Sequence, residues 1–123
     1  MMVEVRLSTE ADADILDILT RTYADFGGDA LRRYEFLIFT ALSELAVSNW
    51  RHGVVTRPEL GYGVHSYHLR HSRDRARHPT GIVRRPRHFI LYRHVLPERI
   101  GVGRILHDAM EVERHLPRSF GDE

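Results

Sequence analysis

The 123-residue sequence contains no cysteine, and this absence excludes disulfide bonds and zinc sites built from thiolates. It is compatible with a reducing compartment but does not require one. Lysine is absent too, so all 18 basic residues are arginine. Arginine favours bidentate contacts with carboxylate and phosphate groups. The complete loss of lysine is nevertheless better explained by the base composition of the source genome than by a binding requirement.

The sequence also lacks long apolar runs. None approaches the roughly 20 residues that a membrane span requires, and acidic residues follow the N-terminal segment Met1–Arg6 too closely for a signal peptide. We therefore expect a soluble, cytoplasmic protein. A chain of this length predicts one domain that buries about two thirds of its unfolded surface. We place that domain at residues 1–117 and expect residues 118–123 to form a flexible tail.

The net charge of +1 conceals a strong asymmetry along the chain. Residues 1–50 contain 4 arginines and 9 acidic residues, residues 51–107 contain 12 arginines and 3 acidic residues, and residues 108–123 contain 2 arginines and 5 acidic residues. The middle segment also holds 8 of the 9 histidines. Two interpretations follow. Either the middle segment presents a basic patch to a phosphate backbone or an acidic protein, or the acidic and basic parts neutralise each other across the fold.

Hydrophobic periodicity predicts a strand followed by two helices. Apolar and charged residues alternate over residues 3–7, as in a half-buried strand. Ser8 is a candidate N-cap, and apolar residues then recur at spacings of three and four until Gly27-Gly28, which predicts an amphipathic helix. Asp29 is expected to cap a second helix that ends near Ser48. Because the connection is short, the two helices should form an antiparallel hairpin.

The second half of the sequence predicts three strands, at residues 64–70, 87–95 and 99–106. The short connection between the last two makes them antiparallel neighbours. Residues 70–85 are rich in arginine and in helix breakers, and should form an exposed loop. Asp108 is expected to cap a last short helix. The predicted fold class is α+β: an N-terminal strand, an antiparallel helical hairpin, a three-stranded antiparallel sheet and a short C-terminal helix, with one sheet face partly open.

Four segments together resemble, in order and spacing, the ParE branch of the RelE/ParE toxin superfamily. They are residues 3–27 (VEVRLSTEADADILDILTRTYADFG), 57–70 (RPELGYGVHSYHLR), 84–95 (RRPRHFILYRHV) and 104–116 (RILHDAMEVERHL). The resemblance extends over residues 3–116 and implies a helical hairpin packed on a small twisted antiparallel sheet. It also implies the toxin of a type II toxin–antitoxin pair, which poisons DNA gyrase when free and is held inactive by a cognate antitoxin whose flexible tail wraps over it.

Basic residues near the matching segments are the candidates for contacts with these partners. They are Arg70, Arg85, Arg87, His88, Arg93, Arg104 and His107. An antitoxin tail that supplies carboxylates and apolar anchors would fold on binding across the basic sheet region. In this interpretation the protein has no catalytic residues, and it needs no cofactor.

The alternative is an mRNA endonuclease of the RelE branch, which acts at the ribosome. Cleavage through the ribose 2′-hydroxyl needs a base, an acid and cations that stabilise the developing negative charge. Arg87 and Arg104 would supply the cations, and His107 the acid or base. The match is incomplete, because lysine is absent and Asp108 places an anion where it would oppose phosphate binding. We therefore prefer inhibition of gyrase by binding.

Each candidate residue also has a structural interpretation. His107 can hold the junction between a strand and a helix, and Arg104 can pair with Asp108 or with a helix carboxylate. Arg87 and His88 can protect a strand end against edge-to-edge pairing.

No metal site is expected. His65, His68 and His71 are the nearest group of possible ligands, but in a strand a spacing of three puts His68 on the opposite face from the other two.

Overall fold

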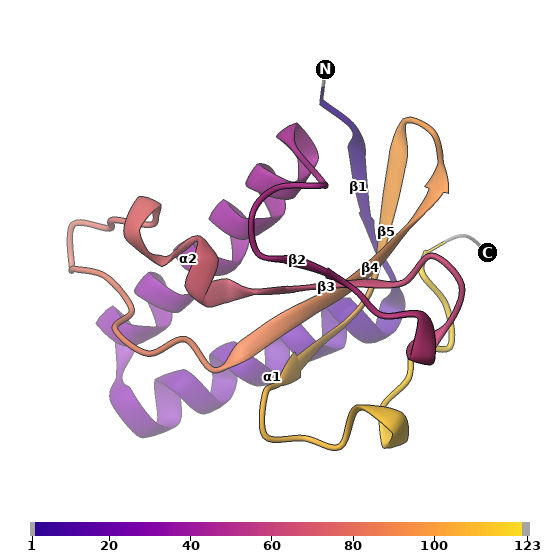
Figure 1. The fold of residues 1–123 in the computed structure, drawn as a ribbon. Coiled ribbons are helices and arrows are strands. Elements are labelled where there is room, and N and C mark those ends of the chain that lie inside the picture. Colours follow the sequence, from indigo (N-terminus) through magenta and orange to yellow (C-terminus); the bar gives the residue numbers. More distant parts are fainter. Residues whose placement is uncertain (1, 122–123) are drawn as a thin grey trace.

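The computed structural model describes residues 2–121, which form a layer of two helices packed on a twisted sheet (Figure 1). In chain order the elements are β1 (Glu4–Leu7), α1 (Thr9–Phe26), α2 (Gly28–Val47), β2 (Val54–Thr56), β3 (His65–His68), β4 (His88–Leu96) and β5 (Arg99–His107). The sheet has the strand order β1-β5-β4-β3-β2, with β1 parallel to β5 and the other neighbours antiparallel. The predicted α+β class is confirmed.

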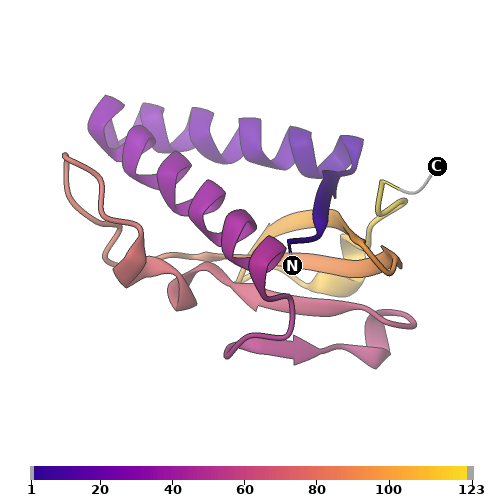
Figure 2. The same cartoon turned by 90° about the horizontal axis from the view of Figure 1, so that it is seen from above.

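The two helices lie on the same face of the sheet, and α2 turns back along α1 (Figure 2). Ser8 caps α1 as predicted: its Oγ accepts a hydrogen bond from the Ala11 amide at 3.0 Å, and its hydroxyl donates to the Gly103 carbonyl at 2.7 Å. Gly27 alone separates the helices, with a φ of 90° that favours glycine. Asp29 does not cap α2, because it lies inside the first turn. Within the described residues, neither helix is long and apolar enough to cross a membrane.

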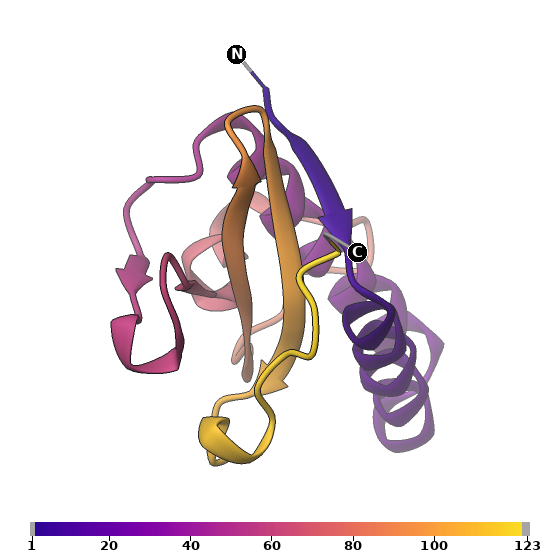
Figure 3. The ribbon, with the colours of Figure 1, turned by 90° about the vertical axis from the view of Figure 1, so that its right-hand side faces the viewer.

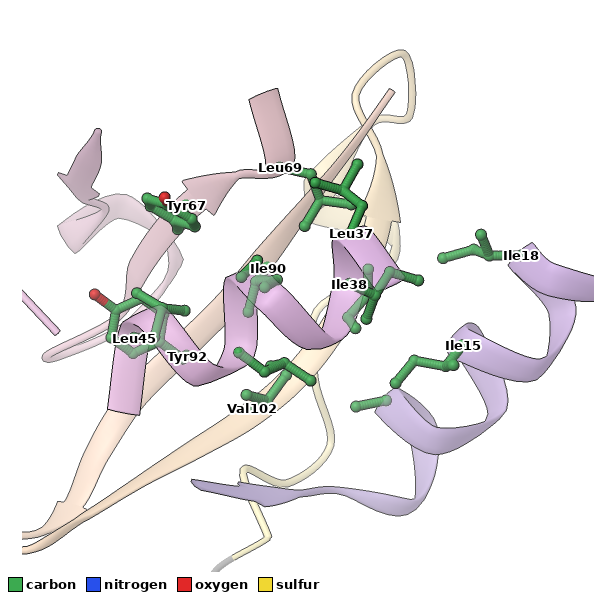
Figure 4. Close-up of a cluster of buried hydrophobic side chains, with 14 of the residues drawn as sticks. Ile15, Ile18, Leu37, Ile38, Leu45, Tyr67, Leu69, Ile90, Tyr92 and Val102 are labelled. Atoms are coloured by element: carbon green, nitrogen blue, oxygen red, sulfur yellow. The ribbon is translucent and has the colours of Figure 1, made fainter. Parts of the chain in front are cut away.

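The main core lies between α2 and the sheet (Figure 4). Seven residues of α2 are buried but only three of α1, so α2 is the inner helix. The largest side chains at this interface are Leu37, Ile38, Leu45, Tyr67, Leu69, Ile90, Tyr92, Ile100 and Val102. Ile15 and Ile18 of α1 close the cluster at its edge. The helices are therefore held to the sheet by apolar burial at the helical spacing that the sequence shows.

The C-terminal segment packs on the opposite face of the sheet and runs along β5 (Figure 3). Phe120 is 6% exposed there and completes a second cluster with Phe89, Leu91 and Leu106. This face is therefore more covered than the sequence indicates. The flexibility of residues 118–123 stays a prediction, and residues 122–123 of that tail lie outside the described residues.

Two details of the predicted fold are wrong. The sheet has five strands, since β1 adds parallel to β5 and the three-residue strand β2 adds to β3. Residues 108–116 do not form a helix but contain only a 3-10 turn at Val112–Arg114. The Asp108 carboxylate does not cap a helix and instead accepts hydrogen bonds from His68 and Arg87.

Glycines in β5 allow the C-terminal segment to approach the sheet closely. A Cβ atom on Gly101 would lie 1.8 Å from the carbonyl oxygen of Phe120. We expect Gly101→Ala to displace Phe120 and to lower the free energy of unfolding by about 1–3 kcal/mol, the usual cost of overpacking. Urea denaturation measures this. Gly28→Ala is the control, because its Cβ would meet nothing closer than 3.9 Å. A Gly101→Ala protein as stable as the control would contradict the expectation.

Candidate functional site

A groove of about 1430 Å³ lies between the helices and one end of the sheet. Its walls come from α1, the first turns of α2, residues 77–88, and the end of β5 with the turn that follows. Its floor is apolar and includes Ile18, Val83 and Ile105. Five of the seven predicted contact residues line it: Arg85, Arg87, His88, Arg104 and His107. The structure thus brings together residues that lie up to 22 positions apart in the chain.

The other two predicted residues lie elsewhere. Arg70 is exposed in the turn that follows β3, outside the groove lining. The Arg93 guanidinium lies 4.6 Å from the centre of the Phe120 ring. Since Phe120 covers the sheet face opposite the helices, Arg93 belongs to that face and not to the groove.

Arg104 is held by a carboxylate of α1. Its Nε and Nη2 donate to the two oxygens of Asp14 at 2.8 and 2.9 Å, and Glu10 lies 3.5 Å from Nη1. The Ile105 amide donates to the same Asp14 carboxylate at 2.9 Å. These contacts raise the pKa of Arg104 above its usual value, first through the hydrogen bond to Asp14. The guanidinium therefore joins α1 to β5, as the structural interpretation of Arg104 requires.

Arg87 is also paired with a carboxylate, that of Asp108. The Arg87 Nε and Nη2 both lie 3.1 Å from Asp108 Oδ1, and His68 Nε2 donates to Oδ2 at 2.9 Å. His68 Nδ1 accepts the amide hydrogen of Arg70 at 3.0 Å, which places the ring proton on Nε2. Burial raises the pKa of Asp108, but the hydrogen bond from His68 and the charge of Arg87 outweigh it and leave the pKa below its usual value. Asp108 is thus held as an anion beside Arg87, which lines the groove.

A tyrosine and two histidines form the inner end of the groove. Tyr34 Oη lies 2.6 Å from His88 Nδ1 and accepts the Arg87 amide hydrogen at 3.1 Å, so its own hydrogen points to His88. Burial lowers the pKa of His88 to about 4 and raises the pKa of Tyr34 to about 12. Both are neutral near pH 7. The His107 ring meets His88 edge-on at 5.2 Å, and its Nδ1 accepts the Ala109 amide hydrogen at 3.0 Å.

Sequence reasoning missed Tyr34 and Asp14. Tyr34 belongs to the apolar stripe of α2, and its spacing indicates only a core residue. Asp14 appears as one more acidic residue near the start of α1. Their partners lie 54 and 90 positions away, so no local pattern identifies them.

The groove is lined by seven arginines and three aspartates. Asp14 pairs with Arg104, and Asp17 pairs with Arg21 at 3.2 Å. Three other arginines of the lining are exposed: Arg77, Arg84 and Arg85. Among the described residues, their guanidinium groups have no hydrogen-bond or ion-pair partner. The groove therefore offers an apolar floor beside an excess of positive charge. This combination suits a segment that carries apolar side chains and carboxylates.

Within residues 2–121, no group of three or more histidine, aspartate or glutamate side chains is placed to hold a metal ion. His65 and His68 are the ends of β3, whereas His71 lies in the turn beyond it. Comparison of the sequence with protein-family models gave no match, and comparison with curated protein sequences gave none either.

Proposed function

We propose that the chain is the toxin of a type II toxin–antitoxin pair that acts in the cytoplasm by binding and poisoning DNA gyrase, and that a cognate antitoxin neutralises it. The four segments that resemble the ParE branch support this, and so does the order of the elements. A helical hairpin follows the first strand and packs on a sheet in which β3, β4 and β5 are antiparallel. This part of the fold agrees with what the resemblance implies, although the whole sheet has five strands and is mixed.

The pairing of the candidate catalytic cations is the observation that favours binding over RNA cleavage. Arg104 is neutralised by Asp14, and Arg87 by Asp108. A nuclease needs cations free to meet the phosphate as charge develops on it. An RNA phosphate at this position would have to displace both carboxylates. We therefore assign no catalytic residue and treat Arg87 and Arg104 as structural supports of a binding surface.

The groove is the proposed binding site of the antitoxin tail. Its excess of arginine complements carboxylates, and its floor complements apolar anchors. Phe26 lines it at the end of α1 and is 77% exposed, so its ring is accessible to a segment that enters the groove. An arriving tail would bury this ring.

We expect Phe26→Ala to weaken antitoxin binding at least tenfold, because exposed aromatic anchors dominate the energy of such interfaces. The partner is the product of the small reading frame expected beside this gene, and titration calorimetry measures the affinity. Leu16→Ala is the matched control, since Leu16 lies on the same helix, is 70% exposed and does not line the groove. If the two variants bind the antitoxin with equal affinity, the tail does not bind in this groove.

The target is tested separately with purified gyrase. We expect the protein to inhibit supercoiling or to cause cleaved DNA to accumulate, and no effect at micromolar protein would overturn the proposal. Primer extension on translated mRNA tests the RelE-type alternative. If transcripts are cleaved in cells whose growth the protein arrests, the target is the ribosome and not gyrase.

A further inference from the structure

The segment from Arg70 to Arg87, called here the arginine loop, is the most basic part of the chain. It contains seven arginines and one acidic residue. Three of these arginines form ion pairs with carboxylates of the same chain: Arg73 with Asp74, Arg75 with Glu44 and Arg87 with Asp108. Internal pairing therefore explains only part of the charge of this loop.

Four arginines of the loop remain exposed, and within the described residues no hydrogen bond or ion pair is recorded for their guanidinium groups: Arg70, Arg77, Arg84 and Arg85. Four uncompensated guanidinium groups on one segment attract a polyanion.

The arginine loop is fixed in place by the rest of the protein. His78 and Gly81 exchange backbone hydrogen bonds of 3.0 and 2.8 Å across a tight turn, and Arg33 Nη1 donates to the Thr80 carbonyl at 3.0 Å. The His78 ring contacts Phe36 of α2, with the ring centres 5.8 Å apart. The loop extends beside α2 before the chain enters β4 (Figure 1). Its arginines are therefore presented on a formed surface, which lowers the entropic cost of binding.

We propose that the arginine loop binds the phosphate backbone of duplex DNA without reading its sequence. Arginine provides bidentate contacts to phosphate. Single-stranded nucleic acids are usually held by stacking on aromatic rings, but the loop contains no phenylalanine, tyrosine or tryptophan. An acidic peptide would use the apolar floor of the groove, whereas the free charge continues outside the groove to Arg70. Backbone contacts to a duplex need neither rings nor an apolar floor.

Two of the three aspartates that line the groove are already paired with arginines. Asp14 and Asp17 across the groove are paired with Arg104 and Arg21. Among residues 2–121, Asp25 is the remaining aspartate of the groove lining. The loop side of the groove thus keeps a positive field.

Fluorescence anisotropy with a labelled duplex of random sequence tests the inference. The wild-type protein should bind with a log K that falls with log salt at a slope of about −3 to −4, as expected for four phosphate contacts. The double variants Arg84→Ala/Arg85→Ala and Arg70→Ala/Arg77→Ala should each bind about tenfold more weakly at low salt and show about half that slope.

Arg32→Ala/Arg114→Ala is the matched control. It removes the same charge from two exposed positions outside the loop and the groove, where the partners are Asp29 and Glu111. It should bind DNA almost as the wild type does. An equal loss in the control, affinity that does not change with salt, or tighter binding to single-stranded DNA or duplex RNA would overturn the inference. Absence of DNA binding with gyrase inhibition intact would reject this inference alone, whereas DNA binding without any effect on gyrase would reject the proposed function alone.

Discussion

Asp14→Ala should lower the free energy of unfolding by about 2–3 kcal/mol, the upper part of the range expected when a charged hydrogen-bond acceptor is removed from partly buried donors. The Asp14 carboxylate accepts three hydrogen bonds, two from Arg104 at 2.8 and 2.9 Å and one from the Ile105 amide at 2.9 Å. The side chains of Asp14 and Arg104 are only 14% and 17% exposed. Removing the Asp14 carboxylate would leave the Ile105 amide without its acceptor, and Arg104 would keep only Glu10 at 3.5 Å and the His115 carbonyl at 3.3 Å. The higher helix propensity of alanine returns less than about 1 kcal/mol of this.

Two further variants separate this network from a general effect of charge on α1. Asp14→Asn keeps an acceptor for the Ile105 amide but removes the charge, so it should cost less than Asp14→Ala. Asp17→Ala removes an exposed carboxylate from the same helix, where the pair with Arg21 is worth about 0.5 kcal/mol or less. Urea denaturation gives all three values. A loss for Asp14→Ala no larger than that for Asp17→Ala would show that the bridge between α1 and β5 does not hold the fold together.

The helical layer could be predicted from the sequence because its signals are local. The cap at Ser8, the apolar spacing and the break at Gly27 all lie within a few residues of the structure they determine. The strands β4 and β5 were predicted for the same reason. In contrast, β2 has only three residues, too few to show alternation, and its place in the sheet depends on pairing with β3.

The prediction of a C-terminal helix could not take tertiary contacts into account. Asp108 is a residue type that commonly caps helices, but its carboxylate contacts His68 and Arg87, and both come from other parts of the chain. The same limit applies to the site. Charge counting identified a basic middle segment, yet only the fold separates arginines with internal partners, such as Arg104, from exposed ones such as Arg84. Residue type predicts where charge is, and tertiary contacts decide which charge is available.

Acidification should destabilise the protein through His88. Burial, followed by the neighbouring His107, lowers the pKa of His88 to about 4, whereas a histidine in an unfolded chain has a pKa of about 6.5. Between these values the unfolded chain binds a proton that the folded protein excludes. The free energy of unfolding should therefore fall as the pH drops from 6.5 to 4, by up to about 1.4 kcal/mol per pH unit and about 3 kcal/mol in total. A proton on Nδ1 would also break the hydrogen bond from Tyr34.

Replacing the ring isolates its contribution from that of the carboxylates, which also titrate in this range. His88→Asn keeps an acceptor for the Tyr34 hydroxyl but cannot take up the proton. Its free energy of unfolding, measured in urea at several pH values from 7 to 4.5, should decline by about 2 kcal/mol less than that of the wild type. His52→Asn is the control, because it makes the same exchange at an exposed histidine outside the groove. If the free energy of unfolding falls equally with pH in the wild type and in His88→Asn, the folded protein accepts the proton at this position. The contact between Tyr34 and His88 would then not keep the inner end of the groove neutral.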